Sequence, residues 1–263
     1  MDLSAYLRKD VGERDLTTKL VVPDVDGTAY VICCEDAVVA GIDEASEIFE
    51  AAGADVSPLA KDGDRVRAGS RVMSVSGPLA GIITCRRTAL GFLSRMTAVA
   101  TEASETVRKA DGVPVTSYDT STPGFGDFER KAVAVGGGVS RSGALDSCIL
   151  VRKEHAKACG SLRNALSRLD RAPFFLKKEA EVDNEDDARA AAEAGIDIIL
   201  IRGKDADAAR RMADAARSVS PAISVEVSCG KDEAGAYKGV ADIASVDGLI
   251  ADAGFKRFSI EML

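Results

Sequence analysis

The chain has no tryptophan and a single histidine among its 263 residues. Its six cysteines form no CxxC pair and have no zinc-site spacing, so we expect them to be reduced and mostly core-filling; they are Cys33, Cys34, Cys85, Cys148, Cys159 and Cys229. No apolar run approaches the roughly 18 residues of a membrane span. The start, MDLSAYLRKDVGERD, is charged where a signal peptide would be apolar. The sequence therefore predicts a cytosolic protein.

Charge of one sign is not concentrated in any part of the chain. The formal net charge is −8 at pH 7, with acidic and basic residues interspersed. This pattern argues against a nucleic-acid-binding or membrane-binding surface and favours a protein that handles small molecules. The length allows one large domain or two smaller ones.

Residues 1–110 have the pattern of an α+β domain. Residues 28–34 and 71–75 alternate like strands, and residues 42–52 place apolar side chains on one helical face. Residues 83–110 continue as one long helix without an internal proline, because Leu90, Leu93 and Met96 recur on one stripe.

From residue 111 the pattern changes to alternating strands and helices. The strand candidates are residues 113–117, 148–152, 174–182, 196–202, 222–228 and 243–246. Repeated βα units of about 25 residues are typical of a parallel barrel or a doubly wound sheet. We favour the barrel because no GxGxxG follows the first strand. Residues 111–250 then form an α/β barrel, and we expect residues 251–263 to pack back on the first domain.

Residues 136–155, GGGVSRSGALDSCILVRKEH, combine a glycine run, a short apolar strand and a charged end. Glycines let the backbone approach a ligand closely. Arg152, Lys153 and His155 follow the apolar strand at its carboxyl end, where parallel α/β proteins place their chemistry. An ordinary solvated loop after a core strand is the competing interpretation.

Two further strands carry charges on one face. Lys177, Glu179 and Glu181 share a face, as do Ser224, Glu226 and Ser228, because side chains alternate along a strand. Such charges are costly under a layer of helices unless they pair or bind a ligand.

Other interpretations of these charged residues remain open. Arg152 and Arg202 each end an apolar run, and we expect neighbouring strands whose arginines point into one mouth. A buried structural ion pair is the alternative for Glu181 and Arg152. A loop residue that contacts only backbone is the alternative for His155, and a lysine at 177 or 178 would suit the Schiff-base chemistry of an aldolase.

Six segments occur in a characteristic order: Asp15-Leu16-Thr17-Thr18, DGDRVRAG at 62–69, RTALGFLSR from Arg87, Thr122-Pro123-Gly124, Gly136-Gly137-Gly138-Val139 and AGIDIILI from Ala194. In order and approximate spacing they resemble the type II phosphoribosyltransferases typified by quinolinate phosphoribosyltransferase, also called nicotinate-nucleotide pyrophosphorylase, and the related ModD-like proteins. The resemblance runs almost from end to end.

This resemblance implies an α/β fold, with an N-terminal α+β sandwich domain and an incomplete parallel α/β barrel. It implies a homodimer, or a higher homo-oligomer, in which one subunit's N-terminal domain caps its partner's barrel. The reaction would transfer ribose 5-phosphate from phosphoribosyl pyrophosphate, with Mg²⁺ as the expected cofactor. Arg87 matches an arginine donated across the dimer interface, Glu181 an interior carboxylate, and Ser228 with Gly230 a phosphate-binding turn.

The chain departs from this family where substrate anions are expected. Asp119-Thr120 stands in place of an Arg-Lys pair, and Ser140-Arg141-Ser142 in place of Asn-His-Arg. Arg152 replaces a lysine, and Ile201-Arg202 replaces Leu-Asp, so a guanidinium stands where a carboxylate would help to hold magnesium. Lys153-Glu154-His155 replaces Asp-Asn-His, and its Glu-His ending is similar to the ModD-like proteins.

We therefore expect a phosphoribosyltransferase with a nitrogen-containing aromatic acceptor other than plain quinolinate. Glu181 and Arg152 are the expected catalytic residues, and no side chain is assigned as a metal ligand. The expected substrate-binding residues are Arg87, Arg141, Arg202, Lys153, His155, Glu226, Ser228 and Gly230. The alternatives are a genuine quinolinate phosphoribosyltransferase with rearranged ligands and a non-catalytic metabolite-binding protein of the same fold.

Overall fold

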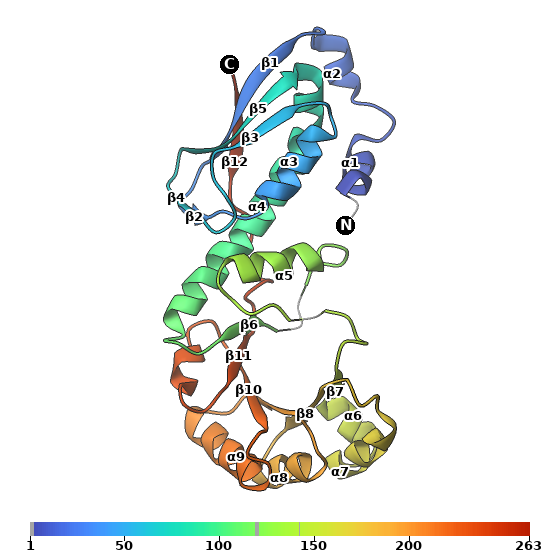
Figure 1. Ribbon diagram of the computed structural model, residues 1–263, viewed down its shortest axis with the longest axis vertical. Helices are drawn as coiled ribbons and strands as arrows, with labels where there is room; N and C mark the ends of the chain where they lie inside the picture. Colours follow the sequence, from blue (N-terminus) through green and yellow to red (C-terminus); the bar gives the residue numbers. More distant parts are fainter. Residues whose placement is uncertain (1–2, 119–120, 142) are drawn as a thin grey trace. The chain divides into compact units, whose positions relative to one another are not determined.

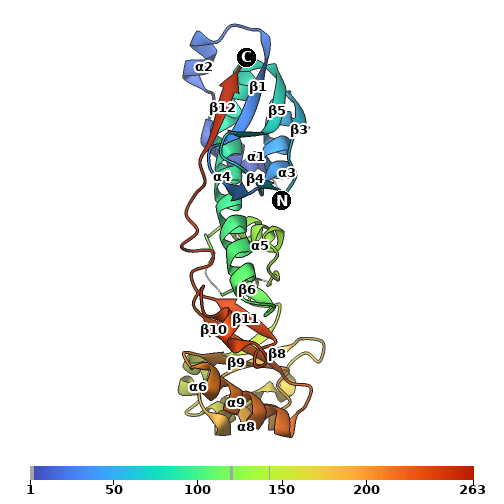
Figure 2. The same ribbon diagram turned by 90° about the vertical axis from the view of Figure 1, so that its left-hand side faces the viewer.

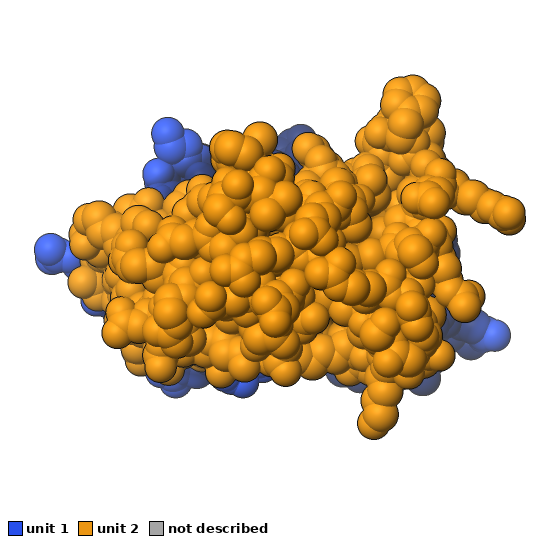
Figure 3. Space-filling view, turned by 90° about the horizontal axis from the view of Figure 1, so that it is seen from below, with its two compact units in different colours: residues 1–104, 122–137, 251–263 blue, residues 105–121, 138–250 orange. Residues whose placement is uncertain are grey.

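A computed structural model describes residues 3–118, 121–141 and 143–263. Asp119, Thr120 and Ser142, where the sequence departs from the family pattern, lie outside the described residues. The chain forms two compact units, coloured separately in Figure 3. The first comprises residues 1–104, 122–137 and 251–263, and the second comprises residues 105–121 and 138–250. Residues 122–137 thus belong to the first unit, whereas the sequence assigned them to the barrel.

The first unit is built on an antiparallel sheet (Figure 1). Its elements are α1 (Leu3–Val11), α2 (Leu16–Val21), β1 (Asp26–Cys33), β2 (Ala37–Val38), α3 (Ile42–Glu50), β3 (Asp55–Pro58), β4 (Arg65–Val66), β5 (Ser70–Pro78), α4 (Leu79–Lys109, of which 79–104 belong here), α5 (Gly126–Val135) and β12 (Phe258–Met262). The four-stranded sheet has the order β12-β1-β5-β3, and β2 pairs with β4 separately. Figures 1 and 2 show α3 and α4 along one face of the larger sheet.

Local chemistry explains why these elements form. Side chains of β1 alternate between buried and less buried positions, as expected of a strand with one covered face. The Asp15 carboxylate caps α2 by accepting a hydrogen bond from the Thr18 backbone N–H at 3.0 Å. Buried Ile82, Leu93 and Met96 form part of the stripe that α4 packs into the core.

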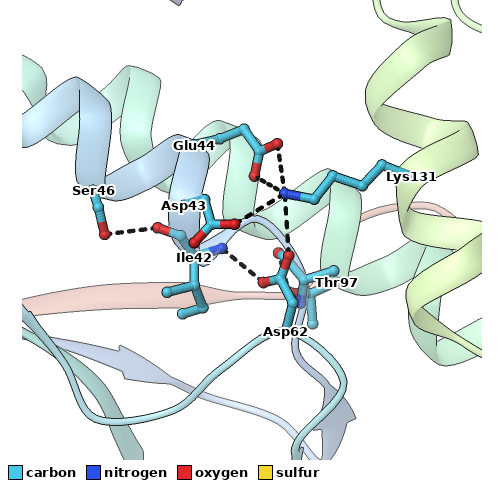
Figure 4. A network of polar contacts seen from close by, with 8 residues as sticks. Ile42, Asp43, Glu44, Ser46, Asp62, Thr97 and Lys131 are labelled. Carbon is cyan, nitrogen blue, oxygen red and sulfur yellow. Dashed lines mark hydrogen bonds and ion pairs between the residues drawn. The ribbon is translucent and has the colours of Figure 1, made fainter.

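Lys131 on α5 connects α5 to α3 through carboxylates (Figure 4). Its Nζ lies 2.9 Å from Glu44 Oε1, 3.4 Å from Asp43 Oδ2 and 3.4 Å from Asp62 Oδ2. Asp62 also accepts a hydrogen bond from the Ile42 backbone N–H at 2.9 Å, which anchors the start of α3. The network joins α3, α5 and the segment that precedes β4.

A second polar clamp is centred on Glu129 of α5, whose side chain is fully buried. Glu129 Oε1 accepts hydrogen bonds from Arg95 Nε at 2.8 Å and Nη2 at 2.6 Å. Its Oε2 accepts the Thr122 backbone N–H at 2.7 Å. The clamp therefore attaches the Thr122-Pro123-Gly124 segment to α4 and α5.

The second unit contains a six-stranded, entirely parallel sheet of order β6-β11-β10-β9-β8-β7. Its elements are β6 (Val115–Ser117), β7 (Ile149–Val151), α6 (Lys153–Ala158), α7 (Leu162–Leu166), η1 (Ser167–Arg171), β8 (Lys178–Val182), α8 (Glu185–Glu193), β9 (Ile198–Arg202), α9 (Ala206–Val219), β10 (Ser224–Cys229), η2 (Ala234–Tyr237) and β11 (Ile243–Val246). Figures 1 and 2 show α8 and α9 side by side along the sheet. The predicted fold class, an incomplete parallel α/β barrel with an N-terminal α+β domain, is confirmed.

Some predicted element boundaries differ from the structure. The strand expected at 174–182 begins only at Lys178, because the preceding residues form a turn in which the Leu176 N–H bonds the Pro173 carbonyl at 3.1 Å. Strands β3 and β12 were not predicted. β12 pairs with β1 from Ala29 opposite Met262 to Cys33 opposite Phe258, so the end of the chain completes the first sheet. No helix in the described ranges has the length and apolar character of a membrane span.

Candidate functional site

The two faces of the parallel sheet differ in chemistry. Paired residues of adjacent parallel strands lie on the same face, so the register assigns each residue to one side. One face is apolar and buried, with Ala180, Val182, Ile199, Ile201, Val225 and Val227. The other face carries Glu179, Glu181, Arg202, Glu226, Ser228, Ser245 and Thr116. The polar face is therefore the candidate site.

Arg141 joins two carboxylates on this polar face. Its Nη2 lies 2.7 Å from Glu179 Oε2, and its Nη1 donates to Glu226 Oε1. Glu179 is on β8 and Glu226 is on β10, with β9 between them. The Arg141 guanidinium bridges both carboxylates across β9, because all three side chains lie on the same face of the sheet. Arg141, expected to hold a substrate anion, is placed as the cation of a buried ion triad.

This triad contains more negative than positive charge. Glu179 and Glu226 are 2% and 4% exposed. Burial, followed by the nearby charge of Glu226, raises the pKa of Glu179 to about 7, although Arg141 opposes the shift. The Glu179 carboxyl group therefore exchanges a proton near neutral pH.

Glu181 lies nearer the carboxyl end of β8 and is 8% exposed. Its Oε2 accepts the Lys153 backbone N–H at 3.3 Å, and its Oε1 lies 3.6 Å from Lys153 Nζ. The same Nζ lies 3.3 Å from Asp183, which also pairs with Lys204 at 2.9 Å. Lys153 is thus held by carboxylates of the chain, and Glu181 stays as a buried acid at the strand end.

Arg152 and Arg202 meet at the ring of Tyr118. The centre of the Arg152 guanidinium lies 5.4 Å from the ring centroid, and that of Arg202 lies 4.5 Å from it. Arg202 Nη1 also donates to the Tyr118 hydroxyl at 3.0 Å, and Nη2 lies 3.4 Å from Asp247 Oδ2. The prediction that β7 and β9 are neighbours is wrong, because β8 pairs between them. Tyr118 brings the two arginines together although their strands are not adjacent.

Ser228 and Cys229 end β10, and Gly230 follows at the same end of the sheet. The Gly230 N–H donates to Glu233 Oε2 at 2.8 Å, so a carboxylate of the chain already uses this donor. Ser228 Oγ is buried and has no hydrogen-bond partner in the described part of the chain. A phosphate at this turn would compete with Glu233 for the backbone N–H.

His155 lies in the first turn of α6, on the exposed side. Its Nδ1 accepts a hydrogen bond from the Arg152 backbone N–H at 3.0 Å. This contact corresponds to the interpretation of His155 as a residue that caps local backbone.

Lys177 is placed away from the mouth of the barrel. It precedes β8, and its Nζ lies 2.8 Å from Asp197 Oδ1, which precedes β9. Chemistry in parallel α/β proteins lies at the opposite, carboxyl ends of the strands. The aldolase-like interpretation therefore loses its geometric basis.

Arg87 belongs to the first unit, where its side chain is 76% exposed. Its Nη2 lies 2.5 Å from Asp10 Oδ1, and this contact lowers the pKa of Asp10. A hollow of about 450 Å³ lies beside it and is also lined by Arg14, Arg86 and Thr17. Sequence reasoning identified Arg87 alone and missed the neighbouring arginines.

A protein-held magnesium site is not formed by the residues that the structure describes. They include no group of three His, Cys, Asp or Glu side chains arranged to bind a metal. Arg202 and its ion-pair partner Asp247 occupy the strand ends where a metal-binding carboxylate was expected. The donor set therefore does not fit a resident Mg²⁺ ion.

The structure adds residues to the site that the sequence did not identify. These are Tyr118, Asp183, Lys204, Asp247, Glu233, and the hydroxyl residues Thr116 and Ser245. Period-two alternation beyond the predicted strand ends would have found Tyr118 and Asp247. No local signal identifies Glu233, because its role depends on a turn.

Comparison with known proteins agrees with this fold. The model of the quinolinate phosphoribosyl transferase C-terminal domain matches residues 99–260, and that of the N-terminal domain matches residues 15–97. The probable nicotinate-nucleotide pyrophosphorylase [carboxylating] of Methanothermobacter thermautotrophicus is 32% identical over 203 residues, covering 74% of this chain and 72% of the relative. That of Bacillus subtilis is 29% identical over 216 residues, covering 80% and 75%.

Solved structures give the same result. NadC from Streptococcus pyogenes superposes with a TM-score of 0.90 at 27% identity, covering 99% of this chain and 96% of the other. A NadC deletion mutant gives a TM-score of 0.91 at 27% identity, covering 99% and 95%. Because both domain models match in order and a relative above 30% identity spans most of the chain, this protein belongs to the quinolinate phosphoribosyltransferase (nicotinate-nucleotide pyrophosphorylase) family of phosphoribosyltransferases.

Proposed function

We propose that this protein transfers ribose 5-phosphate from phosphoribosyl pyrophosphate to a ring nitrogen of an aromatic acceptor that is not plain quinolinate. The observation that supports this proposal most directly is the buried Glu181 at the carboxyl end of β8, in the family's fold. Arginines 152 and 202 stand at the same end of the sheet. A carboxylate surrounded by anion-binding groups suits a reaction that develops positive charge beside phosphates.

In this transfer reaction the protein forms no covalent bond to the substrate. The acceptor's ring nitrogen forms a bond to the anomeric carbon, and the bond from that carbon to the diphosphate oxygen breaks. The electron pair leaves with diphosphate, and positive charge accumulates on the ribose in the transition state. A carboxylate at Glu181 would stabilise that charge, because a low-dielectric site strengthens electrostatic interactions.

Arg152 and Arg202 would bind the phosphate oxygens of the donor. Guanidinium groups form paired hydrogen bonds to phosphate, and stacking on Tyr118 limits their orientation. Magnesium, if used, would enter on the donor's diphosphate, since this ion commonly binds through substrate phosphates and few carboxylates. No step here depends on that ion.

Initial-rate measurements test the proposal. Purified protein is mixed with phosphoribosyl pyrophosphate and a panel of nitrogen heterocycles, and pyrophosphate release is followed. Glu181→Gln should lower kcat by about 10²-fold or more, since it removes charge stabilisation without changing shape. Glu193→Gln is the matched control, because Glu193 pairs with Arg163 on the surface of the same unit.

Two outcomes distinguish the alternatives. We expect weak or absent turnover of quinolinate, because Asp119 and Thr120 stand in place of an Arg-Lys pair. Robust formation of nicotinate mononucleotide would favour a genuine quinolinate phosphoribosyltransferase. Binding of ribose 5-phosphate with no pyrophosphate release for any acceptor would favour a non-catalytic binding protein.

A further inference from the structure

The polar face of the barrel holds three buried glutamates but few cations that are not already paired. Glu179 and Glu226 share Arg141, and Glu181 lies against Lys153. Buried carboxylates require positive charge or hydrogen-bond donors for their stabilisation. The balance of negative and positive charge on this face therefore determines whether it accepts an anionic or a neutral ligand.

The remaining cations at the mouth are paired with further carboxylates. Asp183 accepts Lys153 and Lys204, and Asp247 lies 3.4 Å from Arg202. Arg141, Lys153, Arg202 and Lys204 contact the carboxylates Glu179, Glu181, Asp183, Glu226 and Asp247. With Arg152 included, five formal positive charges stand against five formal negative charges. The formal charges of these groups cancel before a substrate arrives. Because Arg152 and Arg202 are assigned to the donor's phosphates, little positive charge remains for a dicarboxylate acceptor.

Several buried oxygen atoms of the described residues on this face have no hydrogen-bond partner, and they also disfavour a dicarboxylate ligand. Glu179 Oε1 is buried and has no hydrogen-bond partner among the residues with described positions. The same is true of Thr116 Oγ1, Ser245 Oγ and Ser228 Oγ, which strand register places side by side on β6, β11 and β10. An ionised carboxylate oxygen is satisfied only by a donor, and a hydroxyl can act as donor or acceptor. A ligand N–H would satisfy Glu179 Oε1, and the hydroxyls can accept from or donate to a neutral polar group, whereas a ligand carboxylate would add negative charge to the face that holds Glu179.

We propose that the acceptor is a nitrogen heterocycle whose substituent is an uncharged hydrogen-bond donor, an amide or an amine, in place of carboxylates. This inference rests on the proposed transferase function. In the transfer, the ring nitrogen's lone pair forms the bond to the anomeric carbon while the diphosphate leaves with the bonding pair. The substituent stays on the ring, so no carbon dioxide is released and no ring carbon needs a proton.

Three probes with the same ring test the inference. Nicotinamide, nicotinate and quinolinate carry zero, one and two carboxylates. Their dissociation constants are measured by calorimetry at pH 8.5 with ribose 5-phosphate saturating the donor site, and initial rates are measured with phosphoribosyl pyrophosphate. We expect nicotinamide to bind at least tenfold more tightly than quinolinate and to react without release of carbon dioxide.

A variant links the preference to the buried acids. Glu179→Gln keeps the shape of the side chain and removes a negative charge, so the ratio of quinolinate to nicotinamide dissociation constants should fall at least fivefold. Glu193→Gln, on the surface of the same unit, should leave the ratio unchanged. Thermal unfolding checks that both variants fold. If Glu179→Gln does not fold, the ratio measured for the unmodified protein at pH 8.5 against pH 6 gives the same comparison, because protonation removes the same charge.

The outcomes separate this inference from the function on which it rests. Failure of ribose 5-phosphate and phosphoribosyl pyrophosphate to bind contradicts the proposed transferase function. If these donors bind but quinolinate binds as tightly as nicotinamide, or nicotinamide does not bind, the acceptor inference is wrong. An unchanged ratio in Glu179→Gln also overturns it.

Discussion

Replacing Arg141 with methionine removes the guanidinium that lies between two buried carboxylates. In the unmodified protein, Glu179 and Glu226 each contact Arg141, whose side chain is 19% exposed. Breaking a buried ion pair by removing one partner typically costs about 3–5 kcal/mol, because the remaining charge is left uncompensated. We expect Arg141→Met to lower the free energy of unfolding of the second unit by this amount at pH 8.5.

The pH dependence of this loss provides a second measure. Burial and Glu226 already raise the pKa of Glu179 to about 7 with Arg141 present, and removing the cation raises it further. At pH 5.5 Glu179 is therefore protonated in the variant, and part of the repulsion disappears. The destabilisation should be smaller at pH 5.5 than at pH 8.5.

Urea unfolding at both pH values, followed by circular dichroism, measures these changes. The double variant Arg141→Met with Glu179→Gln should recover part of the stability, since it removes the unpaired charge together with its partner. Arg163→Met is the matched control, because Arg163 is an exposed partner of Glu193 in the same unit. A loss below about 1 kcal/mol at pH 8.5, the range of an exposed pair, would refute the assignment of Arg141 as a buried structural cation.

The remaining predictions concern pH, the first unit, ligand binding and assembly. The pKa of Glu179 is raised in the folded protein, so the unfolded chain loses this proton at lower pH than the folded chain does. The free energy of unfolding should therefore fall as pH rises from about 4.5 to about 7 and should not change further above that range. Urea unfolding of Glu179→Gln should lack this fall. Glu129→Ala should destabilise the first unit by about 3–5 kcal/mol, because the variant removes the buried carboxylate partner of Arg95. A loss below about 1 kcal/mol in thermal unfolding, the range of an exposed ion pair, would contradict a stabilising role for the Glu129 contacts. Arg202→Ala should weaken ribose 5-phosphate binding by about 1.5–3 kcal/mol in calorimetry with little change in melting temperature, and unchanged affinity would remove Arg202 from the site. Sedimentation should show at least a dimer whose activity is reduced by Arg87→Ala, whereas a fully active monomer would contradict a shared site.

Much of the fold could be predicted because its signals are local. The strand expected at 243–246 is found there, and residues 83–110 lie within α4 except for the last. Alternation along β8 and β10 correctly grouped Glu179 with Glu181 and Glu226 with Ser228. These signals depend on residues two to four positions apart, which the sequence displays directly.

The site was less predictable because it depends on distant contacts. The sequence showed cations and carboxylates at strand ends but not which of them pair. It did not show that Arg141 contacts both Glu179 and Glu226. Nor did it show that Lys153 lies between Glu181 and Asp183. The strand order also mattered, because it separates β7 from β9. Side-chain pairing across 38 or 85 residues of chain depends on which strands the sheet brings together and not on any local pattern.

The sequence by itself determined the family, the parallel α/β class and the approximate positions of the six parallel strands, because ordered motifs and hydrophobic periodicity depend on neighbours along the chain. Only the tertiary structure decided which charges neutralise one another. Burial raises the energy of an unpaired charge, so Glu179, Glu226 and Arg141 combine once the sheet brings them together. Arg141 leaves Glu179 Oε1 buried and without a hydrogen-bond partner among the described residues. That unpaired oxygen and the charge pairing together determine the kind of ligand that this barrel can bind.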